Sequence, residues 1–165
     1  MADEHRYALE SFFGSDQTIE LVQYVPHCLY LDMKVVEVGP KRAVLSIPYR
    51  DDLVGDPVSG VVFGGVITTL LDQTCGLATL CSLEDIEAIA TLDLRIDYLR
   101  AAEPGRELTA VGECYKLTRS VAFLRGFAYD REPDDPFASC VGAFMVGAHS
   151  NVHPLARRGA QDEGA

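Results

Sequence analysis

The apolar positions of the chain change their spacing several times, and each change predicts a new element. Across residues 17–25 apolar side chains recur at helical intervals, and Pro26 is expected to end that helix. Residues 31–38 and 42–49 read as strands on either side of a Gly-Pro-Lys turn, which predicts a hairpin. Residues 50–61 are rich in turn-forming residues and are expected to form a loop.

Two longer segments follow, and they have different periods. Residues 63–79, FGGVITTLLDQTCGLAT, are apolar at nearly every helical position, which is typical of a helix buried on most sides. Residues 90–99 alternate as a half-buried strand does, with Thr91 on the polar face. The opposite face, which we expect to join the core, carries Ala90, Leu92, Leu94, Ile96 and Tyr98.

The rest of the chain predicts strands only. Residues 106–117 and 121–130 form a second hairpin, and residues 137–147 form the last strand. Consecutive strands joined by tight turns indicate an antiparallel sheet, and the long apolar helix must be what that sheet covers. The predicted fold class is therefore α+β.

The length of 165 residues suits one domain with a sizeable core. We predict a single domain over residues 19–147, with an N-terminal extension at 1–18 and a flexible tail at 148–165. Hydrophobic residues make up 48% of the chain, but no run is long enough to span a membrane. The first residues are charged and carry no apolar signal, so we expect a cytoplasmic protein without a membrane partner.

Charge and cysteine content narrow the function further. The net charge of −11 repels phosphate backbones and argues against a nucleic-acid binder, although a few local cations could still hold a small anion. The five cysteines are odd in number and contain no CxxC pair, which favours reduced thiols over disulfides or a zinc site. The four histidines are scattered, so the sequence predicts neither a metal nor a cofactor.

Asp72 places a carboxylate in the middle of the long apolar helix. An unpaired buried carboxylate costs several kcal/mol, so it acquires a partner, a shifted pKa or a wet cavity. Two interpretations stay open: local donors such as Thr68 and Gln73 satisfy Asp72, or it faces a functional pocket. Gly64 and Gly65 open the same helix, roughly 10 Å from Asp72 by helical rise.

The glycine pair also has two interpretations. It could mark a close packing contact or a flexible helix start. Alternatively, the free N–H groups at the helix start could stabilise an oxyanion that develops on a carbonyl, since glycines let a ligand approach closely. A substrate carbonyl between Gly64 or Gly65 and Asp72 would couple the two features.

This arrangement resembles the hotdog fold, specifically the PaaI-like acyl-CoA thioesterases, over about residues 19–147. The resemblance lies in the helix start VVFGGVITTLLDQTCGLAT, with an acid eight residues after the first glycine, and in the strand TLDLRIDYLRAAEPGREL. It implies an antiparallel sheet wrapped around one long central helix. It also implies a homodimer with a continuous sheet, further paired as a dimer of dimers, with sites at the subunit interface.

The resemblance further implies roles for individual residues. Asp72 would activate water or attack a thioester carbonyl directly, and the N–H of Gly64 or Gly65 would polarise the carbonyl oxygen. Thr91 would orient the water, reaching the site from the other subunit. As a residue of the polar strand face, Thr91 reaches it only if the strand bends or the partner supplies it. Phe63 and Thr68 are candidate substrate contacts.

Phe63 departs from the family pattern, because it stands where the family usually has His, and Pro57 lies near where some members carry Asn. Three interpretations follow: hydrolysis with Asp72 and the glycine N–H alone, a preference for greasier acyl groups, or acyl-CoA binding without turnover. The related hydratases place a His beside an acid, and this helix has no His near it in sequence. We therefore expect acyl-CoA hydrolysis, with non-catalytic acyl-CoA binding as the alternative.

Coenzyme A also needs cations for its phosphates. Arg100, Lys116 and Arg119 stand at predicted strand ends and the hairpin turn, where such contacts are plausible. Each of the three could instead be an ordinary surface charge that only water contacts, as most exposed Arg and Lys side chains are.

Overall fold

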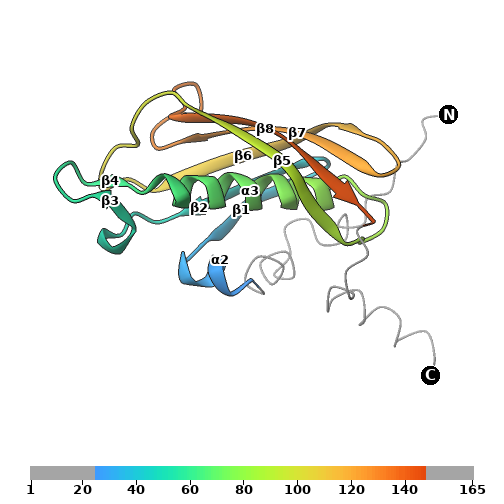
Figure 1. Ribbon diagram of the computed structural model, residues 1–165, viewed down its shortest axis with the longest axis horizontal. Helices are drawn as coiled ribbons and strands as arrows, with labels where there is room; N and C mark the ends of the chain where they lie inside the picture. The colour runs from blue at the N-terminus through green and yellow to red at the C-terminus, as the bar shows by residue number, and fades with distance from the viewer. Residues whose placement is uncertain (1–24, 148–165) are drawn as a thin grey trace.

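The computed structural model describes residues 25–147. The predicted extension (1–18), most of the predicted helix at 17–25 and the tail (148–165) lie outside the described residues. Figure 1 shows the long helix α3 lying along the inner side of a curved sheet, with the short helix α2 below it. This arrangement confirms the predicted α+β class and the hotdog fold.

The elements follow the predicted order, with small additions. They are α2 (Pro26–Tyr30), β1 (Lys34–Gly39), β2 (Arg42–Ile47), the 3-10 turn η2 (Asp51–Leu53), β3 (Val54–Asp56), β4 (Val61–Val62), α3 (Gly64–Leu80), β5 (Ile89–Tyr98), β6 (Leu108–Leu117), β7 (Val121–Tyr129) and β8 (Ala138–Val146). Six strands form one sheet in the order β1-β2-β6-β7-β8-β5, and every neighbouring pair is antiparallel. The strands β1 and β5 are therefore the edges of this sheet.

One local prediction differs from the structure, and another is not tested by it. Pro26 is the first residue of α2, where its fixed φ and missing N–H suit the first helical turn; the predicted end of the helix at 17–25 falls on residues that are mostly outside the described ones. The predicted loop at 50–61 contains η2 and the two-stranded sheet β3–β4. The turn between β3 and β4 is stabilised by Asp56, whose carboxylate accepts hydrogen bonds from Val58 N–H and Ser59 Oγ.

Burial of α3 agrees with its apolar composition. Leu70 and Leu71 have no exposed surface, and α3 packs mainly against β6, β2 and β7. Its threonines tolerate burial because their hydroxyls donate back to carbonyls one turn earlier: Thr74 to Leu70, at 2.6 Å, is one example. The helix can therefore be covered by the sheet without leaving a polar side chain unpaired.

The edge strand β5 contains a β-bulge that sequence periodicity did not predict. Thr91 pairs with Phe144 of β8 and Asp93 pairs with its neighbour Ala143, so Leu92 is an extra residue in the ladder. A bulge reverses the facing of the residues that precede it. Thr91 consequently faces α3, and Leu92 is 55% exposed, so the predicted facing of both residues is wrong.

All five cysteines are free and buried. Burial raises the pKa of Cys81 to about 12. The Sγ atoms of Cys75 on α3 and Cys140 on β8 lie 3.8 Å apart. This contact and burial raise the pKa of Cys75 well above its usual value. No helix within residues 25–147 is both long and apolar enough to cross a membrane.

Candidate functional site

One face of α3 remains polar where the edge strand β5 crosses it. Gly64, Thr68 and Asp72 are spaced four residues apart and so share this face. From β5, Thr91 Oγ1 donates to Asp72 Oδ1 at 2.9 Å, and Tyr98 OH donates to the Gly64 carbonyl at 3.0 Å. We call these five residues the polar row.

Asp72 is half-buried and is oriented by a residue of the same chain. Neither Thr68 nor Gln73 supplies the local donor that one interpretation expected, since Thr68 Oγ1 donates to Gly64 O at 3.2 Å and no bond joins either side chain to Asp72 within the described residues. The β-bulge turns Thr91 onto the carboxylate from its own chain, whereas the resemblance implied that it would reach across from a partner.

The start of α3 is shaped by two aromatic rings. The Phe63 ring lies over Gly65, where an added Cβ would be 2.4 Å from ring atom Cε1. Tyr98 lies against Gly64, where an added Cβ would be 3.4 Å from the phenol oxygen. Both glycines therefore serve as packing contacts. As the first two residues of α3, they also have N–H groups without an acceptor inside the helix. No other group within residues 25–147 accepts a hydrogen bond from either N–H.

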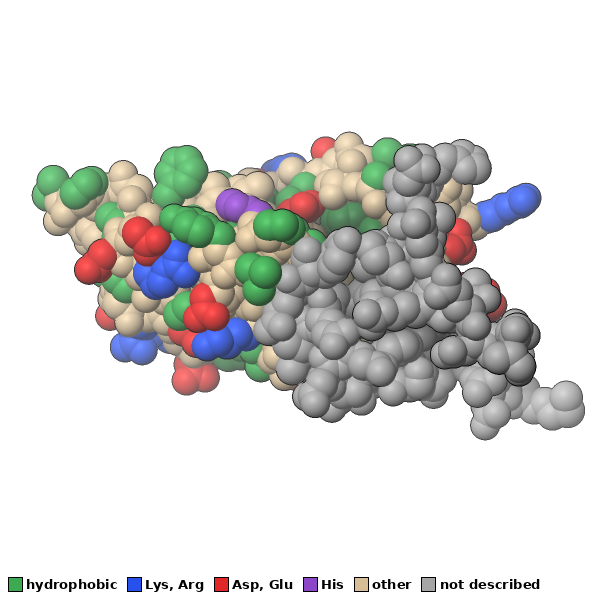
Figure 2. Space-filling model, turned by 90° about the horizontal axis from the view of Figure 1, so that it is seen from below, with side chains coloured by type: hydrophobic (Ala, Val, Ile, Leu, Met, Phe, Trp, Pro, Cys, Tyr) green, Lys and Arg blue, Asp and Glu red, His purple; other side chains and the backbone are tan. Residues whose placement is uncertain are grey.

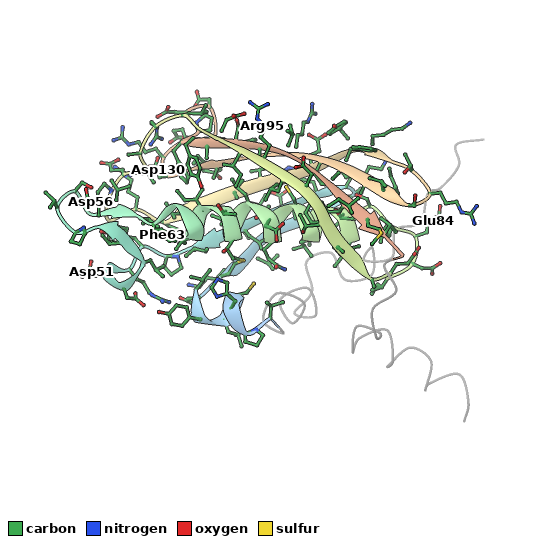
Figure 3. All side chains as sticks on the ribbon, in the orientation of Figure 1. Asp51, Asp56, Phe63, Glu84, Arg95 and Asp130 are labelled. Atoms are coloured by element: carbon green, nitrogen blue, oxygen red, sulfur yellow. The ribbon has the colours of Figure 1, made fainter. Side chains whose placement is uncertain are left out.

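An apolar groove of about 440 Å³ opens beside the glycine pair. It is lined by His27, Tyr30, Leu31, Asp52, Leu53, Val54, Phe63, Gly65 and Val66. Figure 3 places Phe63 at the start of α3, with Asp51 and Asp56 near the same end of the molecule. Figure 2 shows hydrophobic side chains gathered with charged ones on the face that carries α2. Asp72 is not among the residues that line this groove.

A second groove, of about 570 Å³, lies beyond the opposite end of α3. It contains two of the predicted phosphate contacts, Lys116 and Arg119, together with Lys41. Three carboxylates line the same groove: Glu84, Asp85 and Glu87. Its formal charges therefore balance, so electrostatics alone gives it little preference for an anion.

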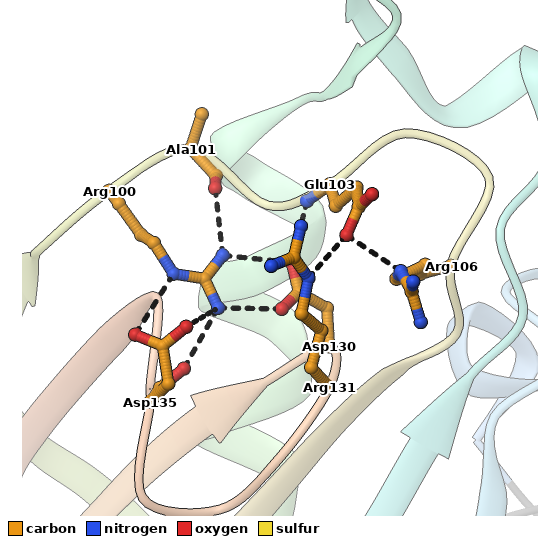
Figure 4. Close-up of polar contacts among 7 residues, drawn as sticks. All are labelled: Arg100, Ala101, Glu103, Arg106, Asp130, Arg131 and Asp135. Carbon is orange, nitrogen blue, oxygen red and sulfur yellow. Dashed lines mark hydrogen bonds and ion pairs between the residues drawn. The ribbon is translucent and has the colours of Figure 1, made fainter.

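Arg100 lies in an internal ion-pair network, shown in Figure 4. Its guanidinium grips the Asp130 carboxylate with two hydrogen bonds, of 3.0 and 2.6 Å, and bonds Asp135 and the Ala101 carbonyl with its other N–H groups. The Asp130 side chain has no exposed surface, and Arg100 lowers its pKa. With all five donors in use, Arg100 is a structural residue in this structure, and we do not retain it as a phosphate contact.

Within residues 25–147, no three His, Cys, Asp or Glu side chains gather closely enough to hold a metal ion.

Comparison with known proteins gives the family. The sequence profile of the thioesterase superfamily matches residues 59–136. A Pseudomonas aeruginosa protein of known structure is 45% identical, with a TM-score of 0.72 over 79% of this chain and 96% of that one. The chain belongs to the thioesterase superfamily. The phenylacetic acid degradation protein PaaI of Thermus thermophilus, solved as a mutant, is 25% identical, with a TM-score of 0.64 over 73% of this chain and 98% of that one.

The chain is also similar to curated proteins, one of which is named as an acyl-CoA thioesterase. The medium/long-chain acyl-CoA thioesterase YigI of Escherichia coli is 29% identical over an alignment of 157 residues, which covers 84% of this chain and all of YigI. Two other curated relatives are 36% and 37% identical, and the chain spans 52% and 64% of their length.

One member of the polar row in this thioesterase-superfamily protein was not predicted from the sequence. Tyr98 was expected in the core, but it is 52% exposed, and its hydroxyl bonds α3. The signal in the sequence was chemical: a tyrosine ending an otherwise aliphatic strand face brings a hydroxyl that needs a partner. His27 was also missed, because α2 brings it into the apolar groove from a segment 36 residues before Phe63 in sequence.

We expect Arg100→Met to lower the free energy of unfolding by about 3 kcal/mol, because Asp130 is left buried and unpaired. Arg95→Met is the control, since Arg95 pairs with Asp97 on the surface and its loss should cost at most about 0.5 kcal/mol. Urea unfolding followed by circular dichroism measures both. Equal losses in the two variants would contradict the structural role of Arg100.

The same pair predicts a pH dependence. The pKa of Asp130 is lowered in the folded state, so its contribution is present above the unfolded-state value, about 3.9, and is lost as pH falls below it. Wild-type stability should therefore fall more steeply on acidification below about pH 4 than that of Arg100→Met.

Proposed function

We propose that this protein hydrolyses acyl-CoA thioesters to the free acid and coenzyme A. The observation that carries the proposal is the half-buried Asp72 carboxylate, oriented through Oδ1 by Thr91 on a polar face of the central helix. Membership of the thioesterase superfamily and the likeness to YigI support a thioester substrate.

The chemistry follows from the arrangement of the polar row. Asp72 takes a proton from water, whose oxygen then attacks the thioester carbonyl carbon, or Asp72 itself attacks that carbon to form an anhydride that water cleaves. In either case the carbonyl oxygen becomes negative, and the N–H groups of Gly64 and Gly65 stabilise it. The C–S bond then breaks, which in the second route completes the anhydride, and the departing thiolate takes up the proton that the attacking water releases. Thr91 restricts the carboxylate to one orientation. This route uses no metal or cofactor.

We assign the two ends of the substrate to opposite ends of α3. The acyl chain enters the apolar groove, where Phe63 and Gly65 form part of the wall. Thr68, exposed between Gly64 and Asp72, contacts the thioester region. Lys116 and Arg119 bind phosphates of coenzyme A at the second groove. The Phe63 ring makes the acyl end apolar, which favours hydrocarbon acyl groups.

We propose that the protein acts as a homodimer that pairs further into a dimer of dimers. The edge strand β5 leaves its outer ladder open and exposes Leu92 and Leu99 beside the polar row. A second copy pairing with β5 would cover these side chains and enclose the site. Val141 and Met145, exposed on β8, offer an apolar surface for the second contact.

The alternative function is binding of acyl-CoA without turnover. Phe63 favours it, because a phenyl ring at this position donates no hydrogen bond to a thioester, and its side chain does not cap the helix.

We expect wild-type protein to release thiol from several acyl-CoAs, and Asp72→Asn to lose at least about 100-fold in kcat, since a carboxamide neither accepts the proton nor attacks. A thiol-release assay over aromatic, short and long acyl-CoAs measures it. The control is Asp93→Asn, an exposed carboxylate of the same strand as Thr91. Equal rates in wild type and Asp72→Asn would remove Asp72 from the mechanism. Tight binding by calorimetry with no thiol release would select the alternative function.

The double variant Lys116→Ala/Arg119→Ala should raise KM for acyl-CoA by roughly fivefold, because charge-assisted contacts to phosphate are lost. The matching acyl-pantetheine, which lacks phosphates, should be used equally well by variant and wild type. Lys34→Ala, which removes an exposed cation on β1, is the control. An unchanged KM for acyl-CoA would place the phosphates elsewhere.

Light scattering of the wild type should give a multiple of the 18.0 kDa chain mass. Leu92→Asp should shift the protein toward the monomer, since a charge on the bulge would be buried in the paired edge. Val58→Asp, at an equally apolar but isolated exposed position, should not. A monomeric wild type at micromolar concentration would overturn the dimer.

A further inference from the structure

The start of α3 lacks the side-chain hydrogen bond that often caps a helix. Its N-cap residue, Phe63, makes no side-chain hydrogen bond to the first turn, and that turn holds no acidic residue. Gly64 and Gly65 follow as the first two helical residues, and glycine has the greatest backbone freedom of any residue. The N–H groups that the proposed reaction uses therefore belong to a helix start without a side-chain cap.

A restraint comes from the edge strand. Tyr98 OH donates to the Gly64 carbonyl at 3.0 Å and lies 3.2 Å from Thr68 Oγ1, which itself lies 3.2 Å from the same carbonyl. The two hydroxyls and the carbonyl form a triangle in which each hydroxyl can donate and the carbonyl can only accept. Tyr98 therefore bonds the Gly64 carbonyl directly, and in its contact with Thr68 either hydroxyl can be the donor.

Tyr98 is itself held firmly despite its exposure. Its backbone pairs with Ala138 of β8. The next two N–H groups, of Leu99 and Arg100, both donate to the Phe137 carbonyl, at 2.8 and 3.3 Å. The Arg100 side chain is then anchored on the buried Asp130. The phenol is thus carried on a rigid segment of the edge strand and can fix the position of what it bonds.

We infer that Tyr98 is a positioning residue for the proposed thioester hydrolysis, on which this inference rests. Its hydroxyl fixes the Gly64 carbonyl and thereby the direction of the Gly65 N–H, which lies in the same planar peptide unit. It acts through Gly64, because its hydroxyl bonds the carbonyl of that residue. Thr91 and Tyr98 together make β5 the strand that sets both ends of the polar row, at Asp72 and at Gly64.

The test compares Tyr98→Phe with Tyr129→Phe, which removes a hydroxyl from a half-buried tyrosine on β7, outside the polar row. Loss of one exposed hydrogen bond leaves the fold intact, so both variants should unfold at the temperature of the wild type. Tyr98→Phe should lower kcat about tenfold with KM within about twofold, because misdirected donors weaken the transition state more than the bound substrate. Tyr129→Phe should change neither constant.

Hydrogen exchange supplies a readout that does not depend on turnover. The amide of Thr68, four residues after Gly64, should exchange faster in Tyr98→Phe and unchanged in Tyr129→Phe, since it reports the first helical turn. Unchanged exchange at Thr68, or a kcat equal to that of the wild type, overturns the inference. An active wild type with an inactive Asp72→Asn and an unaffected Tyr98→Phe would refute Tyr98 alone. A wild type without thiol release would refute the proposed function and with it the catalytic role of Tyr98.

Discussion

A helix that is apolar on nearly every side has to be covered, and this requirement organises the whole molecule. The sheet β1-β2-β6-β7-β8-β5 curves over α3, and its strands bury Leu70, Leu71 and Leu77. A sheet that wraps a helix must end somewhere, and it ends at the edge strand β5. The polar face of α3 lies where β5 crosses the helix, so the only carboxylate of α3 is bonded by the edge strand.

The sequence predicted this architecture well, because it depends on periodicity and turn chemistry that local residues carry. The alternation of Leu94 and Ile96, the two hairpins and the buried helix all follow from such local signals. The special positions of Asp72 and of the Gly64-Gly65 pair were also visible, since a charge or a paired glycine is unusual in an apolar helix.

Other features depend on tertiary structure and could not be predicted from periodicity. The β-bulge at Leu92 arises from pairing with β8, and nothing in the strand's own alternation marks it. Tyr98 was wrongly predicted to join the core, because the alternation of a strand does not show that its end lies beside the start of a helix. Arg100 was misjudged because its partner, Asp130, is 30 residues away and is brought beside it only by the sheet. In each case the missing information was which distant segment of the chain lies beside the residue in the folded protein.

The bulge also has an evolutionary consequence. Thr91 and Asp93 pair with neighbouring residues of β8, so the ladder closes over Leu92 and leaves it outside the pairing. A chain that lacked residue 92 would pair Thr91 and Asp93 in the same way, and the threonine would still face the carboxylate. The chain can therefore gain or lose one residue at this point of the edge strand without any change in the site that the strand positions.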